Sequence, residues 1–201
     1  MKIGPKFKIA KRLGAPIFEK TQTQKFAASA ARVKDKKPGR PGQMSDFKRQ
    51  LIEKQKMRFS YGITERQLRK YVDESLQKSD VPVQFLMSRL ELRLDNVAYR
   101  LGLAKTRRLA RQMASHGHLK VNGKKFTIPS HQLKIGDVIS VRDGSRSSVL
   151  FSELAENHPG AVPAWLSFDV KKLEGKVVSV PQYEPAMTLF DPEQVFEYYS
   201  R

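Results

Sequence analysis

The sequence contains no cysteine among its 201 residues. This absence excludes disulfides, zinc sites built on thiolates and cysteine nucleophiles. No stretch approaches the roughly 20 consecutive apolar residues that a membrane-spanning helix needs, and no signal peptide is visible at the N-terminus. We therefore expect a cytoplasmic protein without a membrane partner.

Acidic residues are scarce relative to basic ones, with 20 Asp+Glu against 38 Lys+Arg and a formal net charge of +18. The imbalance is uneven, because residues 1–80 carry +13, residues 81–150 carry +9 and residues 151–201 carry −4. Such a chain repels itself unless a polyanion neutralises it, and RNA, DNA or an anionic membrane surface are the candidates. We expect the polyanion to meet the first two blocks and to leave the last one free.

The patterns of enzymes are also missing, since we find neither a glycine-rich phosphate loop nor a Ser/His/Asp arrangement. His116 and His118 lie two residues apart without further ligand candidates nearby, whereas a metal site needs three or four converging ligands. Glu91 and Asp95 are spaced like a carboxylate pair, but neighbouring arginines favour salt bridges. The sequence predicts no enzyme, no cofactor, no metal and no small-molecule substrate.

The stretch from residue 93 to residue 125 is the most basic, with nine Lys/Arg and one acid. Apolar residues at spacings of three and four predict one helix with a buried stripe, formed by Leu86, Leu90, Leu94, Val97 and Leu101. Gly102 favours the end of that helix, because glycine adopts the left-handed conformation of a C-terminus without cost.

A second helix is predicted after Thr106, an N-cap residue. Leu109 and Met113 point inward on this helix, while three arginines lie outside: Arg107, Arg108 and Arg111. Residues 118–122 then alternate between polar and apolar, and Asn122-Gly123 is the preferred pair for a type I′ hairpin turn. Guanidinium groups match phosphate oxygens in a bidentate fork, so this array suits a structured nucleic acid. An ordinary solvated basic surface is the alternative.

Residues 86–146 read as a compact α+β module, because a β-branched strand at residues 138–142 follows the two helices and the hairpin. Residues 44–85 read as a helical subdomain with N-caps at Ser45 and at Thr64, the latter in a capping box with Gln67. Its expected inward residues are Phe47, Leu51, Ile52, Met57, Leu68, Tyr71, Val72 and Leu76.

The two ends of the chain read differently from these blocks. Residues 1–43 show no apolar period, so we expect an extended basic arm, with at most a short helix at residues 23–31, that orders against its partner; a flexible tail is the alternative. Residues 147–201 are richer in proline and acids, with a possible helix at 149–157, an apolar anchor around Trp165 and a short strand at 176–180. We expect this segment to pack on the helical subdomain.

The central motifs resemble the RNA-binding module named after small-subunit ribosomal protein S-four. The resemblance rests on RLDNVAYRLG at residues 93–102, TRRLARQ at 106–112, HGHLKVNGK at 116–124, IPS at 128–130 and GDVISVR at 136–142. The flanks are similar to the bacterial-type S-four family itself, through GPK at 4–6, PGQ at 41–43, SDF at 45–47, PAWL at 163–166 and EYYSR at 197–201. The N-terminal zinc cysteines of many members are absent, which marks a metal-free form.

The resemblance implies a structural protein of the small ribosomal subunit. It implies direct binding to small-subunit ribosomal RNA at a helical junction in the 5′ domain, nucleation of assembly, contact with ribosomal protein S-five, and a place near the channel through which messenger RNA enters, with an influence on decoding accuracy. An organellar ribosome remains an alternative location. An RNA-modifying enzyme or its targeting module, and a recycling or stress factor, are the other hypotheses.

We predict that RNA is contacted by basic and polar side chains in three places. In the central module they are Arg93, Lys105, Arg107, Arg108, Arg111, His116, His118, Lys120, Asn122, Lys124 and Lys125. In the helical subdomain they are Lys54, Lys56, Arg58, Arg66, Arg69 and Lys70. In the N-terminal arm they are Lys6, Lys8, Lys11, Arg12 and Arg40.

Overall fold

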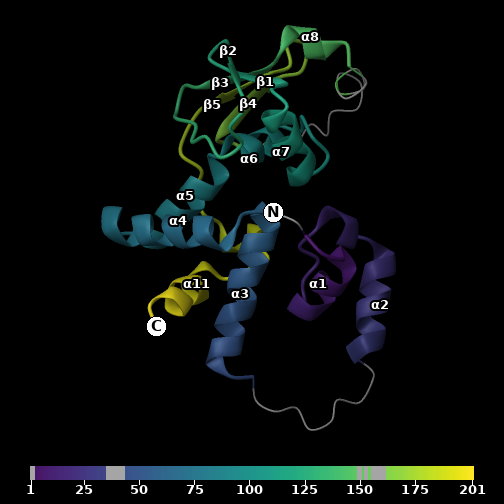
Figure 1. The fold of residues 1–201 in the computed structure, drawn as a ribbon, viewed down its shortest axis with the longest axis vertical. Helices are drawn as coiled ribbons and strands as arrows, with labels where there is room; N and C mark the ends of the chain where they lie inside the picture. The colour runs from purple at the N-terminus through teal and green to yellow at the C-terminus, as the bar shows by residue number, and fades with distance from the viewer. Residues whose placement is uncertain (1–2, 35–43, 149–150, 152–153, 155–161) are drawn as a thin grey trace. The chain divides into compact units, whose positions relative to one another are not determined.

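The computed structural model describes residues 3–34, 44–148, 151, 154 and 162–201 (Figure 1). The chain divides into two compact units. We call Met1–Val83 together with Glu184–Arg201 the helical unit, and Gln84–Tyr183 the sheet unit. The predicted α+β class is confirmed. No helix in the described ranges is long and apolar enough to cross a membrane.

The helical unit is composed of short helices near both chain ends and two longer ones between them. Their bounds are α1 Lys6–Leu13, η1 Glu19–Thr21, α2 Gln24–Lys34, α3 Asp46–Tyr61, α4 Glu65–Lys78, η2 Pro185–Met187 and α11 Pro192–Tyr199. Helices α3 and α4 begin where the sequence predicts, because Ser45 Oγ accepts a hydrogen bond from the Lys48 N–H and Thr64 Oγ1 accepts one from the Gln67 N–H. The Gln67 side-chain amide donates to Tyr71 Oη at 3.1 Å, one turn further along α4.

The apolar faces of α3 and α4 are predicted correctly for most positions. Met57, Leu68 and Val72 are fully buried and Tyr71 is nearly so. Two of the expected inward residues are exposed, because Phe47 keeps 49% and Leu76 keeps 53% of its accessible surface. Phe47 lies at the start of α3, where its ring packs on Tyr198 with the centroids 5.7 Å apart.

The N-terminal region differs from the expected extended arm, because its described residues form α1, η1 and α2. Helix α1 ends at Gly14, which has a φ of 67° and donates its backbone N–H to the carbonyls of Ala10 and Lys11. A small apolar cluster joins Ala10, Leu13, Ala15, Ile17, Phe18 and Phe26, with Ile52 and Phe59 of α3 packed against it. The cluster residues come from short elements and from α3, which lies later in the sequence. No periodic apolar pattern therefore predicts the cluster. Residues 35–43, with the basic turn-rich run, lie outside the described residues.

Helix α11 joins the helical unit at α3, beside which it lies in Figure 1. The Gln50 amide donates to Glu197 Oε2 at 2.8 Å, and the backbone N–H of Asp191 donates to Glu53 Oε2 at 3.0 Å. Val195, on the inner side of α11, is fully buried. The last residues of the chain therefore complete the unit that the first residues begin.

The sheet unit has helices followed by strands, as its sequence predicts. Its elements are α5 Pro82–Glu91, which starts at the end of the helical unit, α6 Leu94–Arg100, α7 Arg107–Ser115, β1 Leu119–Val121, β2 Lys124–Phe126, β3 Val138–Val141, α8 Asp143–Arg146, β4 Leu166–Asp169 and β5 Glu174–Val177. The strands form one antiparallel sheet in the order β2-β1-β3-β5-β4. The predicted turn between β1 and β2 is confirmed, with φ values of 49° at Asn122 and 78° at Gly123.

The core of the sheet unit lies between helices α6 and α7 and one face of the sheet (Figure 1). Leu101, the C-cap residue of α6, and Met113 of α7 pack in the same cluster as Leu119 of β1 and Ile139 of β3. Gly175 of β5 permits this close approach, because a Cβ atom there would lie 2.4 Å from Leu101 Cδ1. The helices are thus held rigidly on the sheet, with their remaining faces turned away from it.

The single helix predicted from residue 86 to residue 101 is wrong, because the structure has two. Helix α5 ends at Glu91, and Arg93 is extended with a ψ of 138° before α6 starts at Leu94. The backbone N–H of Leu94 donates to the His131 carbonyl, and Leu92 accepts from the Leu133 N–H. The apolar spacing continues across this break. The residues that form hydrogen bonds with the backbone at the break lie about 40 positions later, so the local sequence does not predict the break.

The segment after residue 147 also differs from the expectation, because it is shared between the two units. Strands β4 and β5 extend the module's sheet, with β5 paired to the free edge of β3, and only Glu184–Arg201 joins the helical unit. The strand expected at 176–180 occurs earlier, at Glu174–Val177. Most of the helix expected at 149–157 lies outside the described residues.

Candidate nucleic-acid interface

Helix α7 presents three arginines on a scaffold that carries no acid. Thr106 caps the helix as predicted, with Oγ1 accepting from the Leu109 N–H at 3.1 Å. The inner face is buried through Ala110, Met113 and Ala114. The outer face keeps Arg108 exposed and Arg107 and Arg111 partly exposed. The helix therefore offers a cationic ridge whose backbone is fixed by its own cap and core.

Arg107 is oriented by two neighbours on α6. Its Nε donates to Asn96 Oδ1 at 2.8 Å, and its guanidinium lies 4.5 Å from the centre of the Tyr99 ring. Neither partner is charged, so the positive charge of Arg107 is not cancelled by them. An arginine held in one orientation loses less conformational entropy when it binds phosphate, which favours binding.

Glu91 links this arrangement to the end of α5. It accepts hydrogen bonds from Arg100 Nε at 2.9 Å and Nη2 at 2.8 Å, and from the Asn96 amide at 2.8 Å. The predicted salt-bridging role of Glu91 is thereby confirmed. A chain of polar contacts runs from Glu91 through Asn96 to Arg107, so the ridge on α7 depends on residues buried below it.

The hairpin adds exposed lysines from β2. Lys124 and Lys125 are exposed, whereas Lys120 of β1 is paired with Asp143, the first residue of α8. The hydrogen bond from Lys120, together with its charge, lowers the pKa of the Asp143 carboxyl below its usual range. Asn122 is occupied by the turn, since its Oδ1 accepts from the Val138 N–H and its amide donates to Asp137. Lys124 and Lys125 are thus the cations of this hairpin with no ion pair within the described residues.

The two histidines sit where α7 passes into β1. His116 is exposed, and His118 is partly buried with Nδ1 3.0 Å from Ser145 Oγ and its ring 6.3 Å from that of Phe151. The ring centres of the two histidines are 6.1 Å apart. In the part of the chain that is described, no group of three or more His, Cys, Asp and Glu could hold a metal ion.

Arg93 does not belong to the exposed surface. Its side chain is fully buried and donates to both carboxyl oxygens of Asp95, at 2.9 and 2.7 Å. The arginine-pairing role of Asp95 is confirmed. Because Arg93 also caps α6 in an extended conformation, we assign it to the fold and remove it from the proposed RNA contacts.

The basic residues of α3 are largely taken up by acids. Lys54 is 4% exposed, donates to Glu65 Oε1 at 2.6 Å and lies 4.2 Å from the centre of the Tyr198 ring. Arg58 lies 3.6 Å from Glu65, and Lys56 pairs with Glu53 at 2.7 Å. We therefore remove Lys54 from the proposed RNA contacts and regard Lys56 and Arg58 as partly committed to the fold.

Glu65 is the centre of this network, and Tyr199 of α11 donates to it at 2.7 Å. Burial by itself raises the pKa of Glu65, but hydrogen bonds from Lys54 and Tyr199 and the charges of Lys54 and Arg58 outweigh it and lower the pKa. Burial and the hydrogen bond to Glu65 raise the pKa of Tyr199 well above its ordinary value. These shifts indicate a network that favours an ionised glutamate and a neutral tyrosine.

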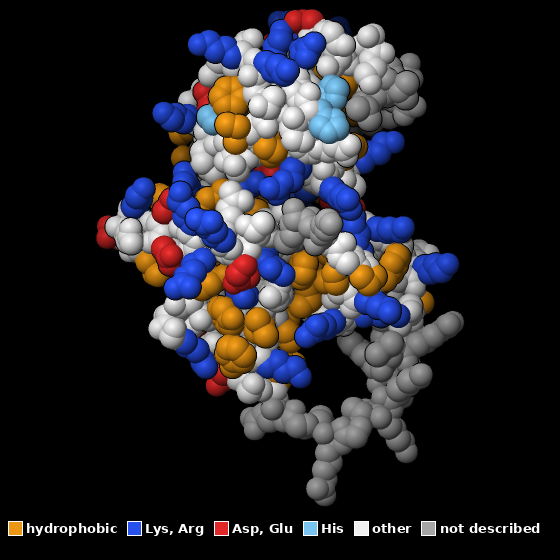
Figure 2. All heavy atoms as spheres, in the orientation of Figure 1, with side chains coloured by type: hydrophobic (Ala, Val, Ile, Leu, Met, Phe, Trp, Pro, Cys, Tyr) orange, Lys and Arg blue, Asp and Glu red, His pale blue; other side chains and the backbone are white. Residues whose placement is uncertain are grey.

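Helix α4 and the N-terminal helices keep freer cations. Arg66 and Arg69 are exposed, and Lys70 is exposed with Glu74 at 3.8 Å. On α1, Lys8 and Arg12 are exposed, Lys11 donates to Ser29 Oγ at 2.7 Å, and Lys6 lies 5.5 Å from the centre of the Phe18 ring. Arg40 lies outside the described residues. Figure 2 shows Lys and Arg side chains spread over much of one face.

Sequence reasoning missed the residues that orient the arginines. Asn96 and Tyr99 are part of a motif noticed for its arginines, and no spacing rule relates them to Arg107 across 11 and eight positions. Arg142, exposed at the end of β3, was also missed. Its backbone N–H donates to the His118 carbonyl, so it lies beside the hairpin. Strand alternation beyond Val141 could have indicated it.

Comparison with known proteins matches both parts of the chain to one family. Residues 92–139 match the S4 domain, and residues 1–91 match the ribosomal protein S4/S9 N-terminal domain. The small ribosomal subunit protein uS4 of Chloroflexus aurantiacus is 40% identical, over 99% of this chain and 98% of that protein. That of Persephonella marina is 41% identical over 98% of both chains.

A further uS4 protein, from Dehalococcoides mccartyi, is 46% identical over 81% of this chain and 79% of its own length. The resemblance seen in the sequence motifs is thus confirmed along nearly the whole chain. The chain belongs to the uS4 family, structural and non-enzymatic proteins of the small ribosomal subunit that bind ribosomal RNA.

Proposed function

We propose that this chain binds small-subunit ribosomal RNA directly at a helical junction in the 5′ domain. The observation that carries the proposal is the combination, in the sheet unit, of oriented Arg107 with Lys105, Arg108, Lys124 and Lys125, which are exposed and have no acid partner within the described residues. Cations fixed on a rigid scaffold recognise the spacing of phosphates, and structured RNA is recognised largely by shape.

The helical unit supplies a second set of contacts in this proposal. Arg66 and Arg69 on α4, and Lys8 and Arg12 on α1, are exposed without an acid partner in the described ranges. Lys6, Lys11 and Lys70 of the same unit have local contacts and complete this set. In the sheet unit, Arg111 and His116 add to the first set, while His118, Lys120 and Asn122 support the hairpin. A protein that contacts RNA from two separate units stabilises the arrangement of several RNA helices, which suits a junction.

The finer roles follow from the family resemblance. We infer that the chain nucleates assembly of the small subunit in the cytoplasm, contacts ribosomal protein S-five and lies near the channel through which messenger RNA enters, where it influences decoding accuracy. The acidic C-terminal block favours a protein contact over an RNA contact, because its charge is −4 over residues 151–201. A structural component of this kind stays at one copy per small subunit after a high-salt wash, whereas a factor washes off.

The test compares two double variants that remove the same charge from the same unit. Lys105→Ala with Arg108→Ala removes two unpaired cations beside the oriented Arg107. Lys171→Ala with Lys172→Ala removes two exposed lysines from the β4–β5 turn and serves as the control. Binding to a 5′-domain RNA fragment is measured by filter binding between about 50 and 300 mM KCl. In roughly this range, affinity that depends on phosphate contacts falls steeply with salt concentration.

We expect the first double variant to reduce the slope of log affinity against log salt concentration by up to about two units, about one for each lost phosphate contact, because fewer contacts release fewer counterions on binding. The control should keep the slope of the unchanged protein. Equal losses in the two variants would mean that only net charge matters, and would contradict the proposed interface.

A further inference from the structure

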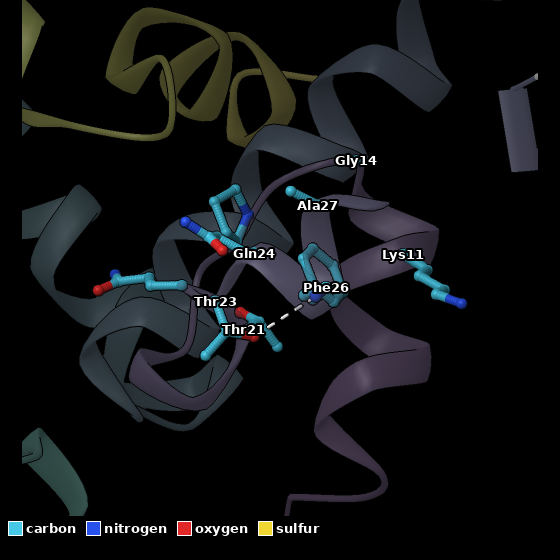
Figure 3. Close-up of a pocket in the computed structure, with 10 residues that line it drawn as sticks. Lys11, Gly14, Thr21, Thr23, Gln24, Phe26 and Ala27 are labelled. Carbon is cyan, nitrogen blue, oxygen red and sulfur yellow. Dashed lines mark hydrogen bonds between the residues drawn. The ribbon is translucent and has the colours of Figure 1, made fainter. Parts of the chain in front are cut away.

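A cavity of about 500 Å³ opens between α1, the loop after it and α2 in the helical unit (Figure 3). Its apolar wall is formed by Ala10, Pro16, Phe26 and Ala27. Phe26 is held in place by the apolar cluster below it and by its backbone N–H, which donates to Thr23. The size lies within the range of about 300–1,000 Å³ that is typical of ligand pockets.

The polar groups around this cavity are of two kinds. Thr21 and Thr23 are used by the fold, since Thr21 Oγ1 donates to the Phe18 carbonyl at 2.7 Å and Thr23 Oγ1 accepts from the Phe26 N–H. Gln22 and Gln24 line the same cavity, are exposed and have no side-chain hydrogen-bond partner within the described residues. Two amides, each able to donate and accept, therefore stand beside an apolar wall.

The charges around the cavity favour a ligand whose inserted group is neutral and whose attached group is anionic. Residues 3–34, which build the cavity, contain eight Lys/Arg and a single acid, Glu19. Of the lining residues only Lys11 is charged, and its ammonium is tied to Ser29 Oγ at 2.7 Å. The interior is thus neutral and the approach is cationic. A phosphate would stay at the rim, while an uncharged, flat, hydrogen-bonding group attached to that phosphate would fit inside.

We propose that this cavity receives one unstacked nucleobase of the ribosomal RNA. The flat faces of the base lie against the apolar wall at Phe26 and Pro16, and its edge meets the amides of Gln22 and Gln24. Splayed bases in RNA loops and bulges are recognised in this way, by apolar or aromatic contact and by hydrogen bonds to their edges. The inference rests on the proposed binding of ribosomal RNA and adds a base-specific contact to phosphate contacts that read no sequence.

The test fills the cavity without changing the charge. Ala27→Trp places an indole in the cavity, whereas Ala28→Trp makes the same substitution at the next position of α2, which is exposed and does not line the cavity. Both variants are bound to a 5′-domain RNA fragment, and the Watson–Crick edges of unpaired bases are probed with dimethyl sulfate for adenine and cytosine and with a carbodiimide for guanine and uracil. Thermal unfolding checks that each variant is folded.

We expect the unchanged protein and Ala28→Trp to protect one unpaired base that Ala27→Trp leaves reactive. Ala27→Trp should bind about tenfold more weakly, in the range of one lost base-stacking contact, and its salt dependence should be unchanged because no phosphate contact is lost. The same footprint and affinity for both tryptophan variants would overturn the inference and leave the proposed function standing. Failure of the unchanged protein to bind would overturn both.

A second variant covers the case in which Ala27→Trp does not fold. Gln22→Ala with Gln24→Ala leaves the cavity open and removes the two free amides. We expect affinity to fall about fivefold, as one or two hydrogen bonds of ordinary strength are lost, with the same base becoming reactive. Undiminished protection of that base would show that the amides do not read it, and would overturn the inference.

Discussion

Helices α3 and α7 are both rich in basic residues, and the structure uses them in opposite ways. On α3, Lys54, Lys56 and Arg58 are paired with Glu65 or Glu53. On α7, no acid is present, Arg108 is exposed without a partner in the described ranges, and Arg107 is held by an amide and a ring. A cation paired with an acid stabilises the fold. A cation without an acid partner keeps a positive charge that can bind a polyanion. Counting charges along the sequence does not separate the two.

The same division occurs inside the sheet unit. Arg93 is fully buried against Asp95, and Arg100 is bound in a bidentate manner by Glu91. Both lie in the most basic stretch of the chain, close in sequence to the exposed Arg108 of α7. The role of a basic residue therefore depends on its partner and its burial more than on its position in the sequence. Variants of buried, paired residues should lose stability, and variants of exposed, unpaired ones should lose RNA binding.

The largest effect is expected for Asp95→Ala, which removes the carboxylate that accepts hydrogen bonds from Nε and Nη2 of the buried Arg93. Removing one partner of a buried ion pair costs about 3–5 kcal/mol, so the sheet unit should be severely destabilised. The lone tryptophan, Trp165, packs against the core of this unit and reports its unfolding in urea by fluorescence. The control is Asp143→Ala, whose partner Lys120 stays solvated, and its urea midpoint should be nearly unchanged. Similar urea midpoints for the two variants would show that the buried ion pair stabilises the fold no more than the exposed one.

A smaller loss is expected for Lys54→Ala in the helical unit. The variant removes a nearly buried ammonium from Glu65 and from the Tyr198 ring, which should cost about 2 kcal/mol in the free energy of unfolding, as for a hydrogen bond to a charged group. Lys48→Ala, an exposed position on the same helix, is the matched control and should unfold like the unchanged protein. Below the unfolding transition both variants should bind RNA with equal affinity. A selective loss of RNA affinity in Lys54→Ala would show that this paired cation also serves binding.

The smallest effect concerns the pH dependence of the Glu65 network. The pKa of Tyr199 is raised above its ordinary value of 10.0, so above pH 10 the folded state keeps a proton that the unfolded state releases. Stability contributed by Tyr199 is therefore complete below pH 10 and falls as the pH rises further. Tyr199→Phe should cost about 1 kcal/mol at neutral pH through the lost hydrogen bond and should remove this alkaline decline, as followed by circular dichroism.

The acid side of the same network has the opposite sign. The pKa of Glu65 is lowered from 4.5, so its contribution is present above pH 4.5 and is lost as the pH falls below that value. Glu65→Gln should flatten this acid limb and also weaken the alkaline one, because the hydrogen bond and the charge of Glu65 help to raise the pKa of Tyr199. Tyr183→Phe, in the sheet unit, is the control for the tyrosine substitution and should retain the alkaline decline. An alkaline limb unaffected by Tyr199→Phe would assign it to another group.

Local patterns predict much of this architecture because local rules decide it. Ser45, Thr64 and Thr106 cap their helices as expected, since a hydroxyl that accepts an N–H three residues later needs no distant partner. The Asn122-Gly123 turn forms because its backbone angles are intrinsic to that pair. Helical spacing likewise predicts which face of α7 carries the arginines, although it does not predict the contacts that orient Arg107.

Three of the errors involve partners outside the local sequence pattern. The break at Arg93 depends on the backbone of residues 131–133, and the burial of Lys54 depends on Glu65 and on tyrosines at the chain's end. The N-terminal helices share their apolar cluster with Ile52 and Phe59 of α3. A one-dimensional pattern contains none of these contacts, so the sequence predicted an extended arm, one helix and free cations at these places.

The discontinuity of the helical unit has a consequence for synthesis of the chain. Residues 84–183 form one continuous block of sequence, whereas the helical unit lacks α11 until residues 192–199 have been synthesised. Nascent domains generally fold as units as they emerge. A chain that stalls before residue 192 would thus display a finished sheet unit beside an unfinished partner, with Lys54 still missing its tyrosine neighbour.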